Sequence, residues 1–405
     1  MLTWLKQLAN GGNADETNVS TLGVRKLVRH DVDPVVLWVP VLLIFFGLVM
    51  VYSASVALPS GSKFESYSPY HFFGRHLLSI TIALVASVFA FRLPTRTWEK
   101  LAPLLFVGTL LLLIMVLIPH VGRVVGGSRR WLPLGVMNLQ PSEVMKLASA
   151  LYAASYCVRK QHDITDFGKG FVPMAVVMGL TGALLLLEPD LGAFMVVVAI
   201  AMAVVFLGGV NYKVFAGIVV SLLAAFSMII WLSPWRRARL FAYLDPWQED
   251  NAQGSAYQLT QSLIAFGRGE LFGVGLGNSV QKMHYLPEAH TDFILAVIGE
   301  EFGMLGVWAV ILAFTVLVRR IFAIGREAMA FDRTFQALAT QGLGVWFGVQ
   351  GFINMGVNMG VLPTKGLTLP FVSYGGSAVL MNCLAIAFVL RVDYENRQLM
   401  RGEKV

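Results

Sequence analysis

The sequence predicts an all-α, polytopic integral membrane protein with about ten transmembrane helices, both termini cytoplasmic, and one large extracytoplasmic loop between helices 7 and 8. Hydrophobic residues make up 56% of the 405 residues and charged residues 14%, with a mean hydropathy of +0.67. Soluble domains carry roughly 25% charged residues. Apolar runs of about 18 residues or more recur, and each can cross ~30 Å of hydrocarbon as a helix. An alternation of period two, which would indicate membrane strands, is not seen.

Proline and glycine punctuate the joins between the apolar runs, which predicts the limits of the spans. The expected spans are about 36–56, 73–92, 101–119, 141–158, 172–188, 191–208, 214–233, 292–318, 335–361 and 376–391. They divide the chain into a mobile cytoplasmic tail at 1–34, a single membrane domain at 35–392 with its outer loop at 234–291, and a cytoplasmic tail at 393–405.

Lysine and arginine favour an arrangement with both termini inside, because basic residues concentrate on the cytoplasmic side of membrane proteins. The bias is weaker than usual, since several basic residues fall on the outer side. These are Arg123, Arg129, Arg130, Arg236, Arg237, Arg239, Arg268, Lys282 and Lys365. An anionic ligand on the outer face is the simplest explanation for them. Cys157 and Cys383 lie far apart in apolar runs, so neither a disulfide framework nor a cysteine-based zinc site is expected.

Asp292 lies where the outer loop becomes the eighth span, in the segment Leu286–Phe293. A helix cap by Thr291 or Asp292 would explain a carboxylate there. A general base at the membrane surface would explain it equally. Glu288 and His290 precede it at alternate positions, which does not favour a dedicated zinc site. A Mg²⁺ or Mn²⁺ ion shared with a phosphate substrate near Asp292 suits these ligands better, although nothing in the sequence requires a cofactor.

Charged residues inside the spans form two further groups. Glu143 and Lys146 open the fourth span three positions apart and can pair on one helix face. Glu300 and Glu301 lie about 12–14 Å deeper than Asp292 along the eighth helix. Such residues face a cavity or a partner. Structural ion pairing and support for a functional site both remain open for these residues.

Two glycine-rich segments lie on the outer side. The stretch from Gly267 to Asn278 contains Arg268 and resembles a nucleotide-binding loop superficially, but it follows no predicted strand and opens no Rossmann unit, which excludes that reading. The second segment, from Thr364 to Ser377, contains Lys365, which could meet a phosphate or be an ordinary loop lysine.

In these motifs the chain resembles the SEDS family (shape, elongation, division and sporulation) of bacterial peptidoglycan glycosyltransferases. The similarity spans nearly all the expected helices and rests on several motifs in order. These are Arg130-Trp131 with Gln140-Pro141-Ser142-Glu143 and Lys146, Pro189-Asp190-Leu191-Gly192, Gly254 to Gln261 with Gly267-Arg268-Gly269, Pro287-Glu288 with His290-Thr291-Asp292-Phe293, and Leu362-Pro363-Thr364-Lys365-Gly366 with Ser373-Tyr374-Gly375-Gly376. Ala289, Gly299-Glu300-Glu301 and the long polar N-terminal tail resemble the division-type branch.

The resemblance implies polymerisation of lipid II into glycan strands on the outer face of the bacterial cytoplasmic (inner) membrane, for septal wall synthesis in cell division. It implies that Asp292 is the catalytic residue, that substrate binding involves Arg239, Lys365, Arg130, Glu288, His290 and Arg268, and that Glu143, Lys146 and Glu300 form supporting ion pairs. The partners that it implies are lipid II, membrane lipid, a class B penicillin-binding transpeptidase and other division proteins of the membrane. It implies no nucleic-acid partner.

Two other classes of function remain open. Intramembrane carboxylates also suit a transporter or flippase of the same lipid, although no inverted repeat is evident. A scaffold of the division complex without catalysis is the third class, in which Asp292 would be a helix cap and nothing more.

Overall fold

The computed structural model describes residues 31–61, 65–125, 127–133, 135, 137–164 and 166–403, so most of the predicted N-terminal tail lies outside the described residues. The long helices are α3 (Pro34–Ser55), α4 (His71–Arg92), α5 (Thr95–Leu117), α6 (Pro141–Arg159), α7 (Val172–Leu187), α8 (Leu191–Leu207), α9 (Tyr212–Trp231), α13 (Ile294–Ala330), α14 (Thr334–Asn358) and α15 (Gly376–Met400). Each coincides with one expected span, which confirms the predicted all-α membrane fold.

Within the described residues, seven helices are long and apolar enough to cross a membrane, namely α3, α4, α5, α7, α9, α13 and α15. Helix α8 is apolar but has only 17 residues. Helices α6 and α14 are less apolar because they are buried along most of their length and pack on each other and on α8. A helix surrounded by protein can carry polar side chains that lipid would not tolerate.

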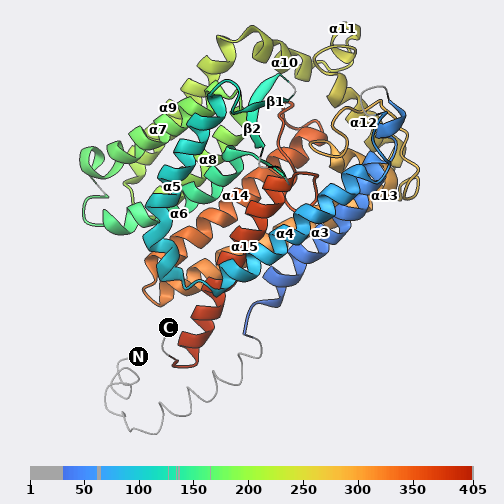
Figure 1. Cartoon of the computed structure of the whole chain (residues 1–405). Helices are drawn as coiled ribbons and strands as arrows, with labels where there is room; N and C mark the ends of the chain where they lie inside the picture. The colour runs from blue at the N-terminus through green and yellow to red at the C-terminus, as the bar shows by residue number, and fades with distance from the viewer. Residues whose placement is uncertain are drawn as a thin grey trace, which may run out of the picture.

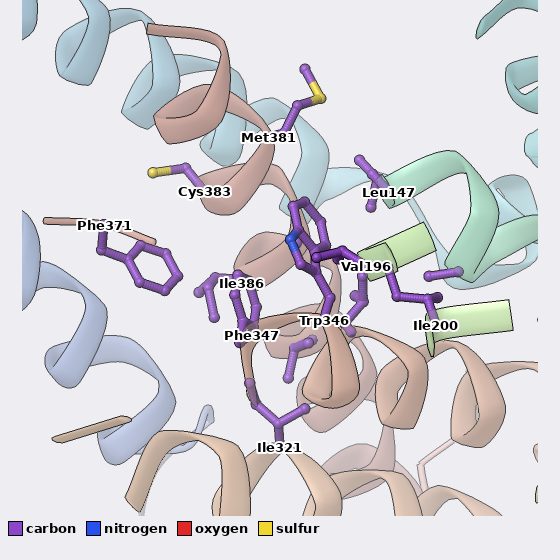
Figure 2. Packing of buried hydrophobic residues seen from close by; sticks show 14 of the residues in the cluster. Leu147, Val196, Ile200, Ile321, Trp346, Phe347, Phe371, Met381, Cys383 and Ile386 are labelled. Carbon is purple, nitrogen blue, oxygen red and sulfur yellow. The ribbon is translucent and has the colours of Figure 1, made fainter. Parts of the chain in front are cut away.

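The bundle is built around this buried pair. Helix α13 packs on α14, α4 on α15, and α5 on α6, while α3 lies against α13 (Figure 1). Figure 2 shows the centre, where Trp346 and Phe347 of α14 meet Leu147 of α6 and Ile386 of α15. Helix α9 differs from its neighbours, because none of its described side chains is buried.

The extramembrane segments contain regular structure that the sequence reasoning did not predict. The outer loop holds α10 (Pro234–Leu244), α11 (Glu249–Ala252) and α12 (Tyr257–Gly269). A small antiparallel sheet of β1 (Arg123–Val125), β2 (Ser128–Pro133) and β3 (Asn138–Leu139) joins α5 to α6, with Arg123 opposite Trp131 and Leu132 opposite Leu139. Short turns of 3-10 helix (η1, Leu58–Ser60) and π-helix (η2, Phe167–Phe171) complete the elements.

The last helix continues beyond its predicted end, so the predicted tail at 393–405 is mostly helical. Helix α15 runs to Met400, and Asp393 and Glu395 are buried. Arg397 lies 2.8 Å from Asp393, and Arg320 of α13 lies 2.6 Å from Asp33, just before α3. The predicted end of this span was placed where charged residues interrupt the apolar run. A helix can continue past that point when ion pairs satisfy the charges of its side chains. Arg397 also lies 3.4 Å from Asp33, so the start of α3 and the end of α15 lie at one end of the bundle, with α10 and α11 at the other (Figure 1).

Candidate active site

Asp292 lies at the mouth of α13, at the end of the bundle that the sequence analysis assigns to the outside. Helix α13 begins after Phe293, and the hydroxyl of Thr291 donates to Glu288 Oε2 at 2.6 Å, so neither Thr291 nor Asp292 caps this helix. The Asp292 carboxylate lies against the 366–375 segment, where a Cβ on Gly366 would stand 3.0 Å from its Oδ2. Glycine at 366 therefore leaves room for this carboxylate.

Three amide side chains of α14, spaced four residues apart, fix the surroundings of Asp292. Asn354 and Asn358 each donate to the Asp292 main-chain carbonyl, at 2.8 and 2.9 Å. Asn354 also donates to the Leu367 carbonyl at 2.6 Å, and Gln350 donates to the Thr368 carbonyl at 2.8 Å. We call Gln350, Asn354 and Asn358 the amide ladder. It binds both segments that border Asp292 to one buried helix.

The segments on either side of the Asp292 carboxylate are also bound to each other. Ser373 donates from its hydroxyl to the Thr291 carbonyl at 2.6 Å, and the Tyr374 amide donates to the His290 carbonyl at 3.0 Å. The His290 ring is buried between Phe72 and Tyr374, with ring centroids 5.1 and 5.5 Å away. Burial lowers the pKa of His290, so the ring is neutral at physiological pH.

The electrostatics of the site shift the titration of Asp292. Burial raises the pKa of Asp292 to about 7, and the negative charges of Glu288 and Asp190 add to the effect, while Arg130 opposes it. Glu288 itself is exposed. A carboxyl group with a pKa near the working pH can both accept and release a proton, which is what a general base requires.

Arg130 is held at the hairpin between α7 and α8. Its side chain donates to the main-chain carbonyls of Glu188 at 2.9 Å and Pro189 at 2.5 Å, and it lies 4.0 Å from the Asp190 carboxylate. Asp190 in turn accepts from the Ser142 hydroxyl at 3.1 Å and caps α8 through the Ala193 amide. The predicted cation at position 130 is thus placed close enough to Asp292 to affect its charge.

Glu188 is a second acid in this region that the sequence reasoning did not single out. It is fully buried, and within the described structure its carboxylate oxygens have no hydrogen-bond partner. Burial and the nearby Asp190 raise the pKa of Glu188 to about 8, with Arg130 acting in the opposite direction. This pKa favours the protonated form of Glu188 at neutral pH.

The predicted ion pair of Glu143 and Lys146 in the fourth span forms, and it lies next to the amide ladder. Lys146 Nζ lies 2.7 Å from Glu143 Oε1 and 2.7 Å from Gln350 Oε1, and it stands over the Trp346 ring. Lys146 and Glu143 are both buried. The pair connects α6 to the amide ladder, which favours the structural interpretation left open by the sequence.

Glu300 and Glu301 also have cationic partners, and these anchor the loop that follows α12. Arg268 lies 2.5 Å from Glu300, which also accepts from the Ser279 hydroxyl. Lys282 lies 2.9 Å from Glu301, which accepts from the hydroxyl of Ser53 in α3 at 2.7 Å. Arg268 was predicted to bind substrate; the structure places its guanidinium on Glu300, and a role in substrate binding stays a prediction.

Lys365 and Arg239 are the two remaining cations that were predicted to bind substrate. Lys365 directly precedes Gly366 and is half-buried, and Arg239 is an exposed residue of α10, whose Tyr243 donates to the Val361 carbonyl at 2.7 Å. Across the described ranges, no cluster of three histidine, cysteine, aspartate or glutamate side chains could hold a metal ion. A divalent cation shared with a substrate phosphate stays a prediction.

The amide ladder is the main feature that sequence reasoning missed. Amide side chains at positions 350, 354 and 358 recur at one helical face within an otherwise apolar span. Polar side chains at a spacing of four in a membrane helix indicate contacts on one face. That spacing was a usable signal, although it does not say which backbone groups the amides bind.

Comparison with known proteins agrees with this geometry. The model of the FtsW/RodA/SpoVE cell cycle protein family matches residues 34–398. The chain belongs to this family. Among curated FtsW/RodA/SpoVE members, a probable peptidoglycan glycosyltransferase FtsW of Burkholderia thailandensis is 64% identical, over 93% of this chain and 81% of that protein. Another of the same name, from Aromatoleum aromaticum, is 53% identical over 97% of this chain and 95% of that protein.

Solved structures of the family share the fold. One comes from a study of how a peptidoglycan synthase complex coordinates polymerization and crosslinking; it matches with a TM-score of 0.71 and 26% identity, over 90% of this chain and 98% of that chain. The Thermus thermophilus rod shape determining protein RodA matches with a TM-score of 0.64 and 25% identity, over 90% of this chain and 97% of that chain. The identities to FtsW relatives place this chain in the division-type branch, as its sequence indicated.

Proposed function

We propose that this protein is a peptidoglycan glycosyltransferase that polymerises lipid II at the outer face of the bacterial inner membrane, for septal wall synthesis. The names of its FtsW relatives support the activity, and its apolar helices support a multi-pass membrane location. The observation that carries the proposal is the Asp292 carboxylate, with its raised pKa, on a residue whose main-chain carbonyl is held by Asn354 and Asn358 at the mouth of α13.

The chemistry follows from the charge of this site. Asp292 accepts the proton of the acceptor sugar's 4-hydroxyl as that oxygen forms a bond to the anomeric carbon of the donor. The bond from the anomeric carbon to the lipid diphosphate breaks, and the bonding electrons leave with the diphosphate. A carboxylate with a pKa of about 7 is a stronger base than an ordinary aspartate, and about half of it is ionised near neutral pH.

The leaving diphosphate carries negative charge and needs cations near it. Arg130, Arg239 and Lys365 are the basic residues proposed for this role. Arg130 is the best supported, because its guanidinium is fixed by two main-chain carbonyls and acts electrostatically on Asp292. A Mg²⁺ or Mn²⁺ ion bound to the diphosphate would supply further positive charge, with Asp292 and Glu288 as the available oxygen ligands.

The test is polymerisation of lipid II by the purified full chain in detergent, with and without a class B penicillin-binding transpeptidase as the proposed partner. Asp292→Asn and Asp292→Ala are compared with Asp250→Asn, which changes an exposed carboxylate of α11. We expect glycan strands from wild type and the α11 variant and at least ~100-fold less from the Asp292 variants. Normal polymerisation by folded Asp292→Ala refutes the assignment of Asp292.

The same assay separates catalysis from transport and from scaffolding. Detergent micelles enclose no compartment, so lipid II cannot be transported across a bilayer in this assay. Glycan strands formed there must therefore result from catalysis by the protein. An Asp292 variant that binds the transpeptidase but makes no strands assigns the carboxylate to polymerisation instead of assembly. Lipid II movement across vesicles without any strand formation by wild type would favour the transporter.

A further inference from the structure

An apolar pocket that the proposed reaction does not use lies between helix α9 and the rest of the bundle. The pocket has a volume of about 650 Å³ and lies between α7, α8 and α9. Its walls include Met174 and Met178 of α7, Val198 and Val205 of α8, and Leu222 of α9. None of the described α9 side chains is buried, and the ring contacts of Phe215 and Phe226 with α8 leave this space open between them.

The pocket begins at the inner ends of α7 and α9 and extends past the middle of the membrane. Its α7 wall runs from the beginning of that helix to Gly179, its α9 wall from Lys213 to Ala225, and its α8 wall from Phe194 to Val205. Helices α7 and α9 both begin at the end of the bundle that the sequence analysis assigns to the cytoplasm. The end of the pocket at Lys213 therefore lies in the inner leaflet, whereas Asp292 lies at the opposite end of the bundle.

Positive charge stands at the inner end of this pocket. Lys213, in the first turn of α9, lines it, and so do Phe167 and Phe171 of η2, between which the exposed Lys169 lies. Basic residues at the cytoplasmic surface attract anionic lipid headgroups, each with about 1 kcal/mol. An apolar cavity of this size open to hydrocarbon is filled, because unfilled space forfeits dispersion contacts.

We propose that the pocket between α7, α8 and α9 binds one anionic phospholipid of the inner leaflet, with its acyl chain in the apolar space and its phosphate at Lys213. The two parts of the site recognise the two parts of the ligand. The apolar walls accept any acyl chain, and the charge selects phosphatidylglycerol over a zwitterionic lipid such as phosphatidylethanolamine.

Two glycines allow the apolar part to be tested without disturbing the bundle. Gly179 and Gly217 line the pocket, and a Cβ added to either meets no atom within 4 Å. Leucine at both positions would fill the space that the acyl chain occupies. Gly108 of α5 is a matched control, because a Cβ there also meets nothing within 4 Å and Gly108 does not line the pocket.

The experiment is native mass spectrometry of the purified full chain in detergent, titrated with phosphatidylglycerol or phosphatidylethanolamine. We expect wild type and Gly108→Leu to retain one phosphatidylglycerol in preference to phosphatidylethanolamine. Gly179→Leu/Gly217→Leu should lose the bound lipid, and Lys213→Gln should bind phosphatidylglycerol about fivefold more weakly while Lys213→Arg keeps it. Size-exclusion profiles establish that each variant is folded.

Three results would overturn the proposal. Equal retention of the two phospholipids by wild type refutes the charge selection. Unchanged phosphatidylglycerol binding by the double leucine variant refutes the pocket as the site. Displacement of bound phosphatidylglycerol by equimolar undecaprenyl phosphate would assign the pocket to a polyprenyl lipid. Lys213→Gln keeps the test decisive if the double leucine variant does not fold, since Lys213 is exposed. Lipid binding is measured without substrate, so the result is independent of glycosyltransferase activity.

Discussion

The side-chain amide of Asn354 donates a 2.8 Å hydrogen bond to the main-chain carbonyl of Asp292, which lies 62 positions earlier in the chain. The same amide donates to the Leu367 carbonyl at 2.6 Å. One buried side chain therefore sets the distance between the proposed base and the segment that contains Lys365. Its amide group has no contact with the Asp292 carboxylate in the hydrogen bonds described, so Asn354 is a positioning residue.

Asn354→Leu should lower both stability and polymerisation. It leaves the Leu367 carbonyl without the Asn354 donor, at a cost of about 1–3 kcal/mol. Asn382→Leu is the matched control, because the Asn382 side chain is buried in α15 and its amide has no hydrogen-bond partner in the described structure. We expect Asn382→Leu to keep or raise the apparent unfolding temperature. Equal losses in the two variants would contradict a specific role for Asn354.

Polymerisation should depend on pH through Asp292. Because the ionised carboxylate acts as the base and its pKa is about 7, activity should fall about tenfold per pH unit on the acid side of that value. Glu288→Gln removes a negative charge that raises the pKa of Asp292, so the half-maximal pH should move downward. The measurement is the pH profile of lipid II polymerisation, with Glu249→Gln on the exposed α11 as control. A half-maximal pH that does not move in Glu288→Gln would exclude this coupling.

Asp292→Asn should make the protein more stable at alkaline pH. The pKa of Asp292 is higher in the folded state, about 7, than in the unfolded state, about 4. The folded state thus binds the additional proton between these values, and stability falls as the pH rises through this window. Asparagine does not titrate, so the stability of the variant relative to wild type should increase between about pH 4 and pH 7. Above pH 7 the difference in stability should stay constant. The apparent unfolding temperature in detergent, measured across this range, checks the sign. A variant that is less stable than wild type at pH 8 would argue against a raised pKa.

Removing one partner of the buried pair Glu143 and Lys146 should destabilise the protein more than removing both partners together. Lys146→Met leaves Glu143 buried without its cation, which costs about 3–5 kcal/mol. Glu143→Gln/Lys146→Met removes both charges and should recover much of that loss. Unfolding of the two variants in parallel gives the comparison. If the double variant were no more stable than Lys146→Met alone, the lost contact with Gln350 would be the main cause.

The sequence by itself determined the fold class, the helices and the region of the site. Runs of apolar residues long enough to cross the membrane can form only helices there, because every backbone group must be satisfied internally. The junction at Asp292 was visible because a charged residue at the edge of such a run stands out. The cation at position 130 was visible because basic residues on the outer side depart from the usual distribution.

Only the tertiary structure decided the partners and the charge state of these residues. The pairing of Arg268 with Glu300, and that of Lys282 with Glu301, depends on where the loop after α12 folds back onto α13, which no local pattern reveals. The continuation of α15 to Met400 depends on the ion pairs of its buried carboxylates, which include Glu395 with Arg333 at the start of α14 and Asp393 with Arg397 within α15. The pKa of Asp292 depends on burial and on Glu288, Asp190 and Arg130, which come from three separate segments. Hydropathy is a local property of the chain, whereas hydrogen-bond partners and electrostatic fields arise from residues that are distant in sequence.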